Sequence, residues 1–251
     1  MKTIALHSSK GGVGKTSAAV NLAYLASKEG LRILLVDLDP QGSSSFLFRM
    51  EPVKGFGGQD LIKGKERSLH EGIRASDYEH LDLIPAALSF RKLESLLADK
   101  GSGKTKGSLK KPLSLLFGSY DLIVLDCPPG ISALAEAIYE ASDMILCPAI
   151  ATPLSQMSLK RLEDFIRKRE LEPAKLRVFI SLFEPRKSVQ ANAALELERS
   201  GFALMKAKVP YSADVERMGS LREPICVSKP GGKASLAFKE LWREAKDILF
   251  A

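Results

Sequence analysis

One short segment, at positions 9–16, constrains the fold of this chain more than any other. It reads Ser-Lys-Gly-Gly-Val-Gly-Lys-Thr, and it stands between an apolar run at 3–8 and a stretch with helical apolar spacing at 17–29. Its glycines let successive backbone N–H groups point into one concavity, and a helix that starts directly after it adds the positive end of its dipole. The pattern predicts a strand, a phosphate-binding loop and a helix, in that order.

The loop motif predicts a chemical role for most of its residues. We expect the Lys15 ammonium to reach the β- and γ-phosphates of a nucleotide, and the Thr16 hydroxyl to bind Mg²⁺. A glycine-rich turn that binds nothing is the alternative, and the strand–loop–helix context argues against it. The residues of this segment expected to contact the nucleotide are Lys10, Gly11, Gly12, Val13, Gly14, Lys15, Thr16 and Ser17.

Three aspartates lie at the ends of two apolar runs. Asp37 and Asp39 come at the end of the run at 32–37, and Asp126 ends another run. Parallel α/β sheets bind ligands at the carboxyl ends of their strands, and a carboxylate beside a magnesium–phosphate site could hold a metal-bound water or orient the nucleophile. A turn-capping role is the alternative for Asp39. The predicted magnesium set is Thr16, Asp37, Asp39 and Asp126.

Strand and helix patterns alternate along the chain. The strand patterns are continuous apolar runs, which are typical of parallel strands buried on both faces. We expect an α/β fold of the phosphate-loop NTPase class: a single domain over 1–251 with a doubly wound, mostly parallel sheet and helices on both faces. Strands are expected at 3–8, 32–37, 81–86, 122–126, 143–150, 176–182 and 205–209, and helices at 17–29, 89–98, 155–169, 188–199 and 234–250.

Composition restricts the cellular context. No apolar run reaches the roughly 18–20 residues that span a bilayer, so we expect a cytoplasmic protein. Three scattered cysteines without metal-ligand spacing favour buried thiols over a disulfide framework. The net charge of +7, from 37 basic and 30 acidic residues, suits a polyanionic partner.

Three motifs resemble the ParA/MinD family of ATPases. These are the tight loop Lys-Gly-Gly-Val-Gly-Lys-Thr from Lys10, the Asp-Leu-Asp-Pro-Gln run from Asp37 and the Asp-Cys-Pro-Pro run from Asp126. The resemblance implies ATP and Mg²⁺ as cofactors, and a slow ATPase in which Lys10, Lys15 and Asp39 are catalytic. In that family the first lysine crosses to the nucleotide of a partner subunit, so that a homodimer sandwiches two ATP molecules. The second aspartate of the Asp-x-Asp run helps to position the attacking water.

The same resemblance implies a function and a location. It implies nucleoid-associated dimers in the cytoplasm that bind non-specific DNA and position or segregate a cargo, with a ParB-like or adaptor protein that stimulates hydrolysis. It places the adenine near Ser181 and Pro210, where serine replaces the Asn or Thr that the family leads us to expect. The DNA-binding residues that it suggests are Lys187, Arg217 and Arg222. The lysine-rich segment 100–111 is a second candidate for DNA contact, and a solvated surface loop is an equal alternative.

Three other functions stay open. A MinD-like ATPase would bind a membrane through an amphipathic tail at 234–250, but the mixed charges on the tail's polar face favour docking on the core, so a membrane partner is not expected. A relative of the nitrogenase iron protein would need a cluster that bridges two subunits. A scaffold with a dead nucleotide site is the third, and the presence of Lys15, Thr16, Asp39 and Asp126 argues against it.

Overall fold

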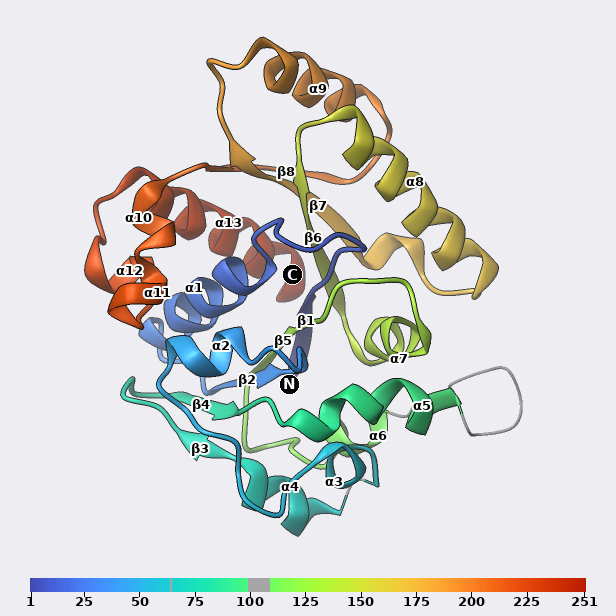
Figure 1. Cartoon of the computed structure of the whole chain (residues 1–251), viewed down its shortest axis with the longest axis vertical. Helices are drawn as coiled ribbons and strands as arrows, with labels where there is room; N and C mark the ends of the chain where they lie inside the picture. Colours follow the sequence, from blue (N-terminus) through green and yellow to red (C-terminus); the bar gives the residue numbers. More distant parts are fainter. Residues whose placement is uncertain (64, 99–108) are drawn as a thin grey trace.

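The strands form one eight-stranded sheet (Figure 1). The computed structural model describes residues 1–63, 65–98 and 109–251. All pairings in the sheet are parallel except that of β3 with β4 at one edge, so the expected doubly wound, mostly parallel sheet is confirmed. In spatial order the strands are β3 (Arg74–Ala75), β4 (Leu81–Ile84), β2 (Ile33–Asp37), β5 (Leu122–Asp126), β1 (Lys2–Leu6), β6 (Met144–Ile150), β7 (Leu176–Phe183) and β8 (Leu204–Pro210).

The central strands are buried on both sides. In β2, Leu34 and Val36 belong to one hydrophobic cluster. Their neighbours Ile33 and Leu35 belong to the cluster on the opposite face. Successive side chains of a strand point to opposite faces, so a strand between two helix layers needs an unbroken apolar run. This is why the sequence shows runs rather than alternation.

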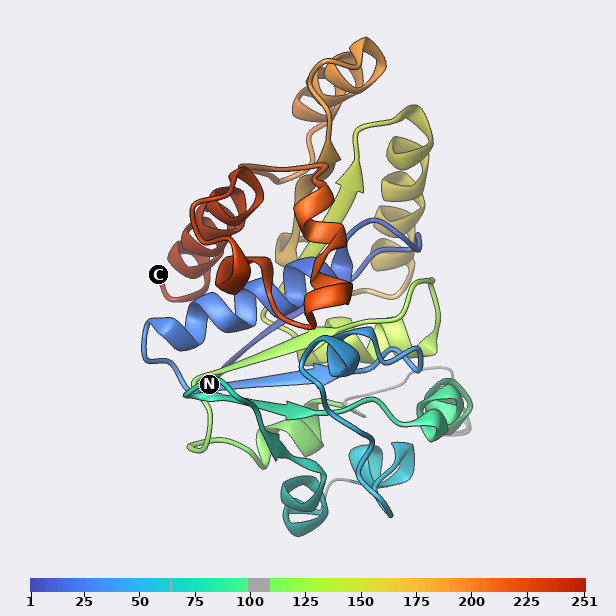
Figure 2. The same cartoon turned by 60° about the vertical axis from the view of Figure 1, so that its left-hand side comes forward.

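Helices cover both faces of the sheet, and Figure 2 shows α1 and α13 side by side on one of them. That face carries α1 (Lys15–Lys28), α2 (Ser43–Leu47), α10 (Ala213–Glu216), α11 (Met218–Leu221), α12 (Ile225–Ser228) and α13 (Lys233–Leu249). The other face carries α3 (Gly58–Lys63), α4 (Glu66–Gly72), the 3-10 turn η1 (Leu88–Lys92), α5 (Leu93–Ala98), α6 (Lys110–Ser114), α7 (Ala133–Ala141), α8 (Pro153–Lys168) and α9 (Ser188–Arg199).

The C-terminal helix α13 docks on the core, as its mixed polar face predicts. The indole N–H of Trp242 donates to a carboxylate oxygen of Glu29 at 3.0 Å. The Glu244 carboxylate accepts hydrogen bonds from the backbone N–H groups of Lys206 and Ala207, which covers part of the free edge of β8. In the part of the chain that the structure describes, no helix combines the length and apolarity needed to cross a bilayer.

Some elements were not predicted from the sequence. The segment between β2 and β4 indicated one helical turn near 60–63, and it contains α2, α3, α4 and the short strand β3. The helix α7 was also missed; it starts after Ser132, whose side chain accepts a hydrogen bond from the backbone N–H of Ala135. Most of the lysine-rich segment lies outside the described residues; of its lysines, the structure describes Lys110 and Lys111, at the start of α6.

Candidate functional site

The loop between β1 and α1 depends on two glycines in the left-handed region. Gly12 has a φ of 69° and Gly14 a φ of 91°, which residues with a Cβ rarely adopt. Gly14 has a second reason to be glycine, because a Cβ there would lie 2.8 Å from the hydroxyl oxygen of Ser181. Helix α1 starts at Lys15 with no side-chain cap and no acidic residue in its first turn. Its first N–H groups and the positive end of its dipole are therefore left for an anion.

The side chain of Lys15 folds back against its own loop. Only 7% of the residue is exposed, and Nζ donates a hydrogen bond to the carbonyl oxygen of Lys10 at 3.1 Å. Burial lowers the pKa of Lys15, and the Asp126 carboxylate is the strongest influence in the opposite direction. An ammonium has three N–H donors, so one that is held by a neutral carbonyl has donors left for phosphate oxygens.

Asp37 and Asp126 lie side by side at the ends of β2 and β5. They are register partners on neighbouring strands, and both are fully buried. Oδ2 of Asp37 accepts hydrogen bonds from the backbone N–H and the hydroxyl of Ser45, at 2.8 and 2.7 Å. Oδ2 of Asp126 accepts from the Ser44 hydroxyl at 2.6 Å. Burial is the main cause that raises the pKa of both carboxyls, and for Asp37 the neighbouring Asp126 carboxylate adds to it.

The donor atoms fit a magnesium ion at Asp126. The Thr16 side chain lies close enough to the Asp126 carboxyl to lower its pKa, against the effect of burial, and Oδ1 of Asp126 has no hydrogen-bond partner among the described residues. Thr16 and Asp39 line a cavity, whereas Asp37 and Asp126 are both fully buried beside it. Oδ1 of Asp37, like that of Asp126, has no hydrogen-bond partner among the described residues. Within the described ranges, no three His, Cys, Asp or Glu residues are grouped to hold a metal by themselves. Phosphate oxygens and water would have to complete the shell, as they commonly do for Mg²⁺.

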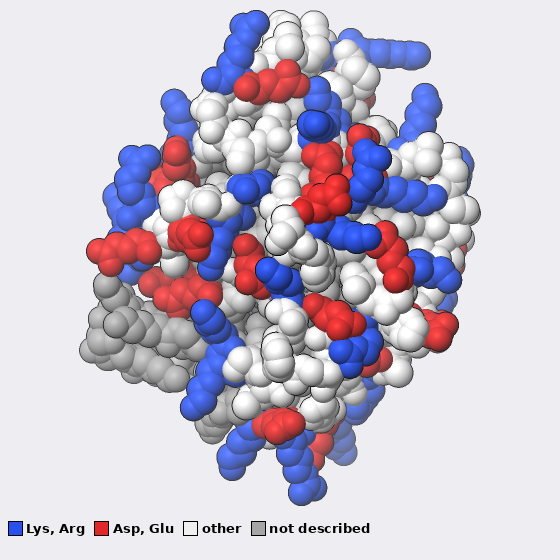
Figure 3. All heavy atoms as spheres, turned by 180° about the vertical axis from the view of Figure 1, so that it is seen from behind, with Lys and Arg blue, Asp and Glu red and all other residues white. Residues whose placement is uncertain are grey.

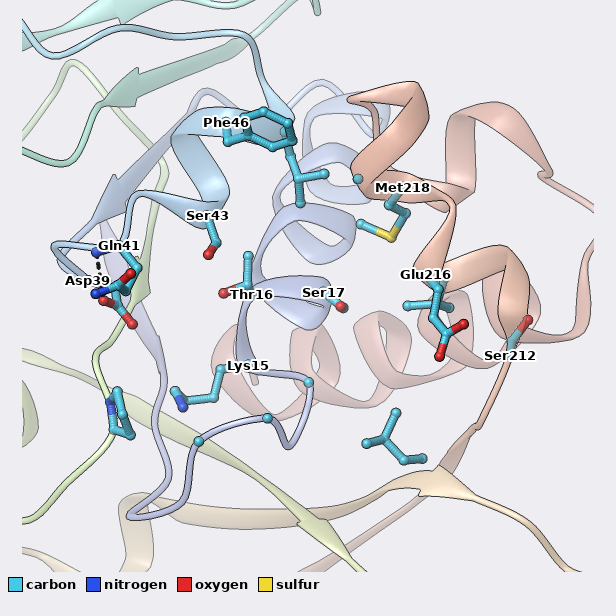
Figure 4. A pocket seen from close by; sticks show the side chains of 18 of the residues that line it. Lys15, Thr16, Ser17, Asp39, Gln41, Ser43, Phe46, Ser212, Glu216 and Met218 are labelled. Carbon is cyan, nitrogen blue, oxygen red and sulfur yellow. Dashed lines mark hydrogen bonds between the residues drawn. The ribbon is translucent and has the colours of Figure 1, made fainter.

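Asp39 makes the turn-capping contacts of one predicted alternative and also lines the cavity. Its Oδ1 accepts a hydrogen bond from the Gln41 N–H at 3.0 Å, and its carbonyl accepts one from the Gly42 N–H at 2.9 Å. The residue therefore caps the turn after β2. It also lines the cavity, on the same side as Gln41 and facing the loop that carries Lys15 (Figure 4).

A cavity of about 740 Å³ opens above the loop and the N-terminus of α1 (Figure 4). This volume lies within the roughly 300–1,000 Å³ that is usual for small-molecule sites. Of the predicted nucleotide contacts in the loop, the residues that line it are Gly11, Gly12, Gly14, Lys15, Thr16 and Ser17. Val13 is buried instead, and Lys10 lines a different depression.

The two predicted adenine contacts are each one residue away from a side chain that lines the cavity. Ser181 is 2% exposed and lies against Gly14, and the next residue, Leu182, is the one in the cavity wall. Leu182 has a φ of 52°, an uncommon value for leucine, where the backbone leaves the strand geometry of β7. At the end of β8, the cavity is lined by Tyr211, the residue after the strand, rather than by Pro210.

Sequence reasoning missed the apolar wall at the far end of the cavity. Its members Phe46, Val215 and Met218 come from three short helices, α2, α10 and α11. Phe46 stands in a serine-rich segment without strong periodicity, and its position four residues after Gly42 is the only sequence signal for it. Asp39 lies on the opposite side of the cavity from Met218, whereas Glu216 and Ser212 add polar groups on the same side as Met218 (Figure 4).

Lys10 points to a depression of its own, of about 490 Å³. Its apolar members Ile131, Leu154 and Met157 are exposed to 39, 64 and 44%. Arg161 adds a second basic side chain. Exposed apolar side chains gathered beside a lysine, next to a phosphate loop, suit contact with another protein surface.

The three predicted DNA-binding residues are not grouped in one cluster. Lys187 lies before α9 and pairs with Glu184 at 2.6 Å. Arg217 lies between α10 and α11 and pairs with Asp214 at 3.5 Å. Arg222 donates a hydrogen bond to the carbonyl oxygen of Phe46, at the cavity wall. Among the described residues on the face that Figure 3 displays, basic and acidic side chains are interspersed, without a uniformly basic region.

Comparison with known proteins gives matches along the whole chain. A family model described as an AAA domain matches residues 1–177. A ParA family protein of Chlamydia muridarum is 31% identical over 260 residues, with 99% of both chains covered. The sporulation initiation inhibitor protein Soj of Bacillus subtilis is 27% identical, with 97% of both chains covered.

Solved structures show the same fold. A putative plasmid partition protein of Borrelia burgdorferi bound to AMPPNP superimposes with a TM-score of 0.78 at 24% identity, covering 97% of this chain and 99% of the other. An ATP complex of McdA from Cyanothece gives a TM-score of 0.81 at 21% identity, covering 100 and 96%.

Proposed function

The chain belongs to the ParA family of partition ATPases, and from that membership we propose that it hydrolyses ATP to ADP and phosphate with Mg²⁺ and positions or segregates a cargo as an ATP-dependent homodimer. The observation that carries the ATPase step is the cavity itself. Its polar end joins Lys15, Thr16 and Asp39 above the buried Asp126, next to an uncapped helix N-terminus.

The phosphates of ATP would lie on the loop. The phosphate chain binds to backbone N–H groups around Gly12 and Gly14 and at the N-terminus of α1. The Lys15 ammonium then exchanges its hydrogen bond to the Lys10 carbonyl for bonds to phosphate oxygens. A bond to a charged oxygen is stronger than one to a neutral carbonyl, so the exchange is favourable.

The magnesium ion would be held by Thr16 and Asp126 together with phosphate oxygens and water. When bound, it neutralises phosphate charge and favours displacement at the γ-phosphate. Asp126 can take this role because it is already fixed by the Ser44 hydroxyl and leaves Oδ1 unpartnered among the described residues. Asp37, its register partner, is equally buried and also has an unpartnered Oδ1 among the described residues, so it stays in the proposed magnesium set; its Oδ2 holds Ser45 and through it the start of α2.

Asp39 would orient the attacking water. Its Oδ1 is fixed by the Gln41 N–H, so the carboxylate has a defined direction in the cavity wall. The described residues of the cavity include no histidine, and a hydrolysis that depends on positioning and charge neutralisation is expected to be slow.

Dimerisation would use the Lys10 depression. Lys10 does not line its own nucleotide cavity, so its ammonium is available for the nucleotide of a second subunit, as an arginine finger acts in trans. The exposed Ile131, Leu154 and Met157 beside it would be covered in that dimer. The apolar patch and the lysine thus support one interface.

DNA would bind to the ATP dimer without sequence preference, which would place the protein at the nucleoid in the cytoplasm. Lys187 and Arg217 are the exposed candidates, each with one acidic neighbour within 4 Å that phosphate would have to replace. Few contacts per subunit make the dimer the better binder. A ParB-like or adaptor protein on the cargo would then stimulate hydrolysis and release the dimer.

The proposal is tested by phosphate release and by titration with a fluorescent ATP analogue. Wild-type protein should release phosphate only when both ATP and Mg²⁺ are present, and EDTA should stop it. Lys15→Ala should weaken nucleotide binding by about 10- to 100-fold, because a charge-assisted hydrogen bond contributes about 1.5–3 kcal/mol. Lys28→Ala, at the other end of α1, is the matched control. Equal affinities of the two variants would contradict the proposed phosphate site.

Two other functions are less well supported by the structure. The helix α13 that a membrane-bound ATPase would insert is docked, with Trp242 bonded to Glu29. A cluster that bridges two subunits needs thiols at the surface, and Cys127, Cys147 and Cys226 are all buried. Co-sedimentation with liposomes in the presence of ATP, and a visible spectrum, test the two directly.

A further inference from the structure

A buried histidine lies directly beneath the start of the phosphate loop. His7 follows β1 and is 1% exposed. The strand register sets Cys127, just after β5, and Cys147, within β6, on either side of it, because its preceding residue Leu6 pairs with Asp126 and Leu146. Its ring stands edge-on to the ring of Tyr139 in α7, with centroids 5.6 Å apart.

The histidine has one polar contact of known direction. Its Nε2 lies 2.9 Å from the carbonyl oxygen of Gly130. A carbonyl only accepts, so Nε2 carries the proton and donates. Nδ1 has no partner among the described residues, nor does the hydroxyl of Tyr139. Burial lowers the pKa of His7 to about 4, so the ring is neutral near pH 7.

The partner of this bond lies in the loop that follows the buried Asp126. Gly130 has a φ of 122°, and its own N–H donates to the carbonyl oxygen of Ser8 at 3.4 Å. Both backbone groups of Gly130 are thereby tied to the two residues that lead into the phosphate loop. The bond from His7 is the shorter of the two, and it comes from a side chain, so it can be changed by substitution.

The residues on either side of Gly130 belong to different surfaces. Pro129 lines the nucleotide cavity. Ile131 lines the depression that contains Lys10. A movement of the loop about Gly130 would therefore change the cavity and the Lys10 surface together.

We propose that His7 is a positioning residue, which holds the 127–131 loop in register with the phosphate loop and so couples the nucleotide cavity to the Lys10 surface. This rests on the proposed ATPase function. Glycine at 130 leaves the backbone free to rotate, and the bond from a rigid, neutral, buried ring fixes its carbonyl. His7 itself touches neither the cavity nor the Lys10 depression, so it acts through Gly130.

The test compares His7→Gln with His7→Met. Glutamine places an amide donor near the position of Nε2, and methionine has a similar volume without a donor. In hydrogen-exchange mass spectrometry, H7M should show about 10-fold faster exchange in the peptide covering 127–134, and H7Q should stay within about 2-fold of wild type. In steady-state hydrolysis, H7M should lower kcat by about 5- to 10-fold with little change in KM, because the loop position matters most in the transition state. H7Q should restore it.

Tyr139→Phe is the control, since it removes a hydroxyl without a described partner and leaves the His7–Gly130 bond in place. It should exchange like wild type. If H7M does not fold, His7→Asn takes its place, because its shorter amide stops short of the Gly130 carbonyl. Equal loop exchange and equal kcat in the donor and non-donor variants would overturn the inference. A wild type without hydrolysis would refute the proposed function, while the exchange data would still decide the link between His7 and the loop.

Discussion

The guanidinium of Arg222 lies over the ring of Phe46, 4.5 Å from its centroid, although the two residues are 176 positions apart. Its Nε also donates a hydrogen bond to the Phe46 carbonyl oxygen at 2.9 Å. The contact joins α2, which follows the turn of Asp39, to the end of α11, and both helices line the nucleotide cavity. Arg222 was predicted as a DNA contact, and this contact also makes it part of the support of the cavity wall.

The contact predicts that Arg222→Ala weakens nucleotide binding. A cation–π contact near the surface contributes about 0.5–1 kcal/mol and a hydrogen bond about 0.5–1.5 kcal/mol, so we expect an affinity loss of about 5- to 60-fold in an ATP-analogue titration. Arg217→Ala is the control, since its side chain is 71% exposed and pairs with Asp214. Wild-type affinity of R222A would show that the wall does not depend on this contact.

Asp39→Ala should separate binding from turnover. Asp39 does not hold Lys15 or the loop glycines, so ATP should still bind, while loss of a water-orienting carboxylate should lower hydrolysis by about 100-fold or more. The variant should then accumulate as an ATP-bound dimer in light scattering. Gln41→Ala leaves the carboxylate in place and serves as the control. Wild-type turnover of D39A would exclude the role given to Asp39.

Lys10→Ala should remove ATP-dependent dimers without unfolding the monomer. The ammonium of Lys10 is outside its own nucleotide cavity, so monomer binding should change less than about 2-fold. Its backbone carbonyl, which holds Lys15, is kept in the variant. Arg161→Ala tests whether any basic residue of the same depression has this effect. Normal dimers of K10A in size-exclusion light scattering would rule out the sandwich model.

His7 predicts a pH dependence of stability with a defined sign. Its pKa is about 4 in the folded protein and near 6.5 when unfolded. As the pH falls, His7 is therefore protonated in the unfolded chain before it is protonated in the folded protein. The contribution of neutral His7 to the free energy of unfolding is complete above pH 6.5 and is lost between pH 6.5 and pH 4. Burial is the main cause of the low pKa of His7. The Gly130 carbonyl raises this pKa, and the nearby Lys15 ammonium lowers it further. Relative to His7→Gln, wild type should lose about 3 kcal/mol in urea unfolding across that range. The same dependence of the free energy of unfolding on pH in wild type and in His7→Gln would contradict this prediction.

The elements that were predicted from the sequence are those determined by residues that lie close together in the chain. The phosphate loop carries its glycines, lysine and threonine within eight positions, and the buried strands β2 and β5 are each five consecutive apolar or acidic residues. The short helices α2, α3 and α4 could not be predicted in the same way. Helices of five to seven residues are marginal alone, and here tertiary contacts hold them, such as Ser45 on Asp37 and Phe56 against Gly72.

The two ends of the site differ for the same reason. Its phosphate end uses residues at 11–17 and the acidic residue after β2. The apolar end is assembled from Phe46, Leu182, Tyr211 and Met218, which meet only after the sheet and its C-terminal helices have formed. The strand order places β7 and β8 on one side of β1. Successive side chains of a strand point to opposite sides, so a prediction that is wrong by one residue names a buried side chain, Ser181, in place of the cavity-lining Leu182.

DNA binding gives the last prediction, and Arg222 has to be left out of its test. We expect ATP-dependent, sequence-independent retention of duplex DNA whose log affinity falls with log salt by roughly 0.9 per phosphate contact. Lys187→Glu/Arg217→Glu should abolish it while dimers still form, because both side chains are exposed and neither lines the cavity. Lys65→Glu/Arg67→Glu, the same charge change at the start of α4, is the control and should keep binding. Retention that ignores salt, or an ATP dimer that coats liposomes and leaves DNA unbound, would favour a membrane-based positioning ATPase instead.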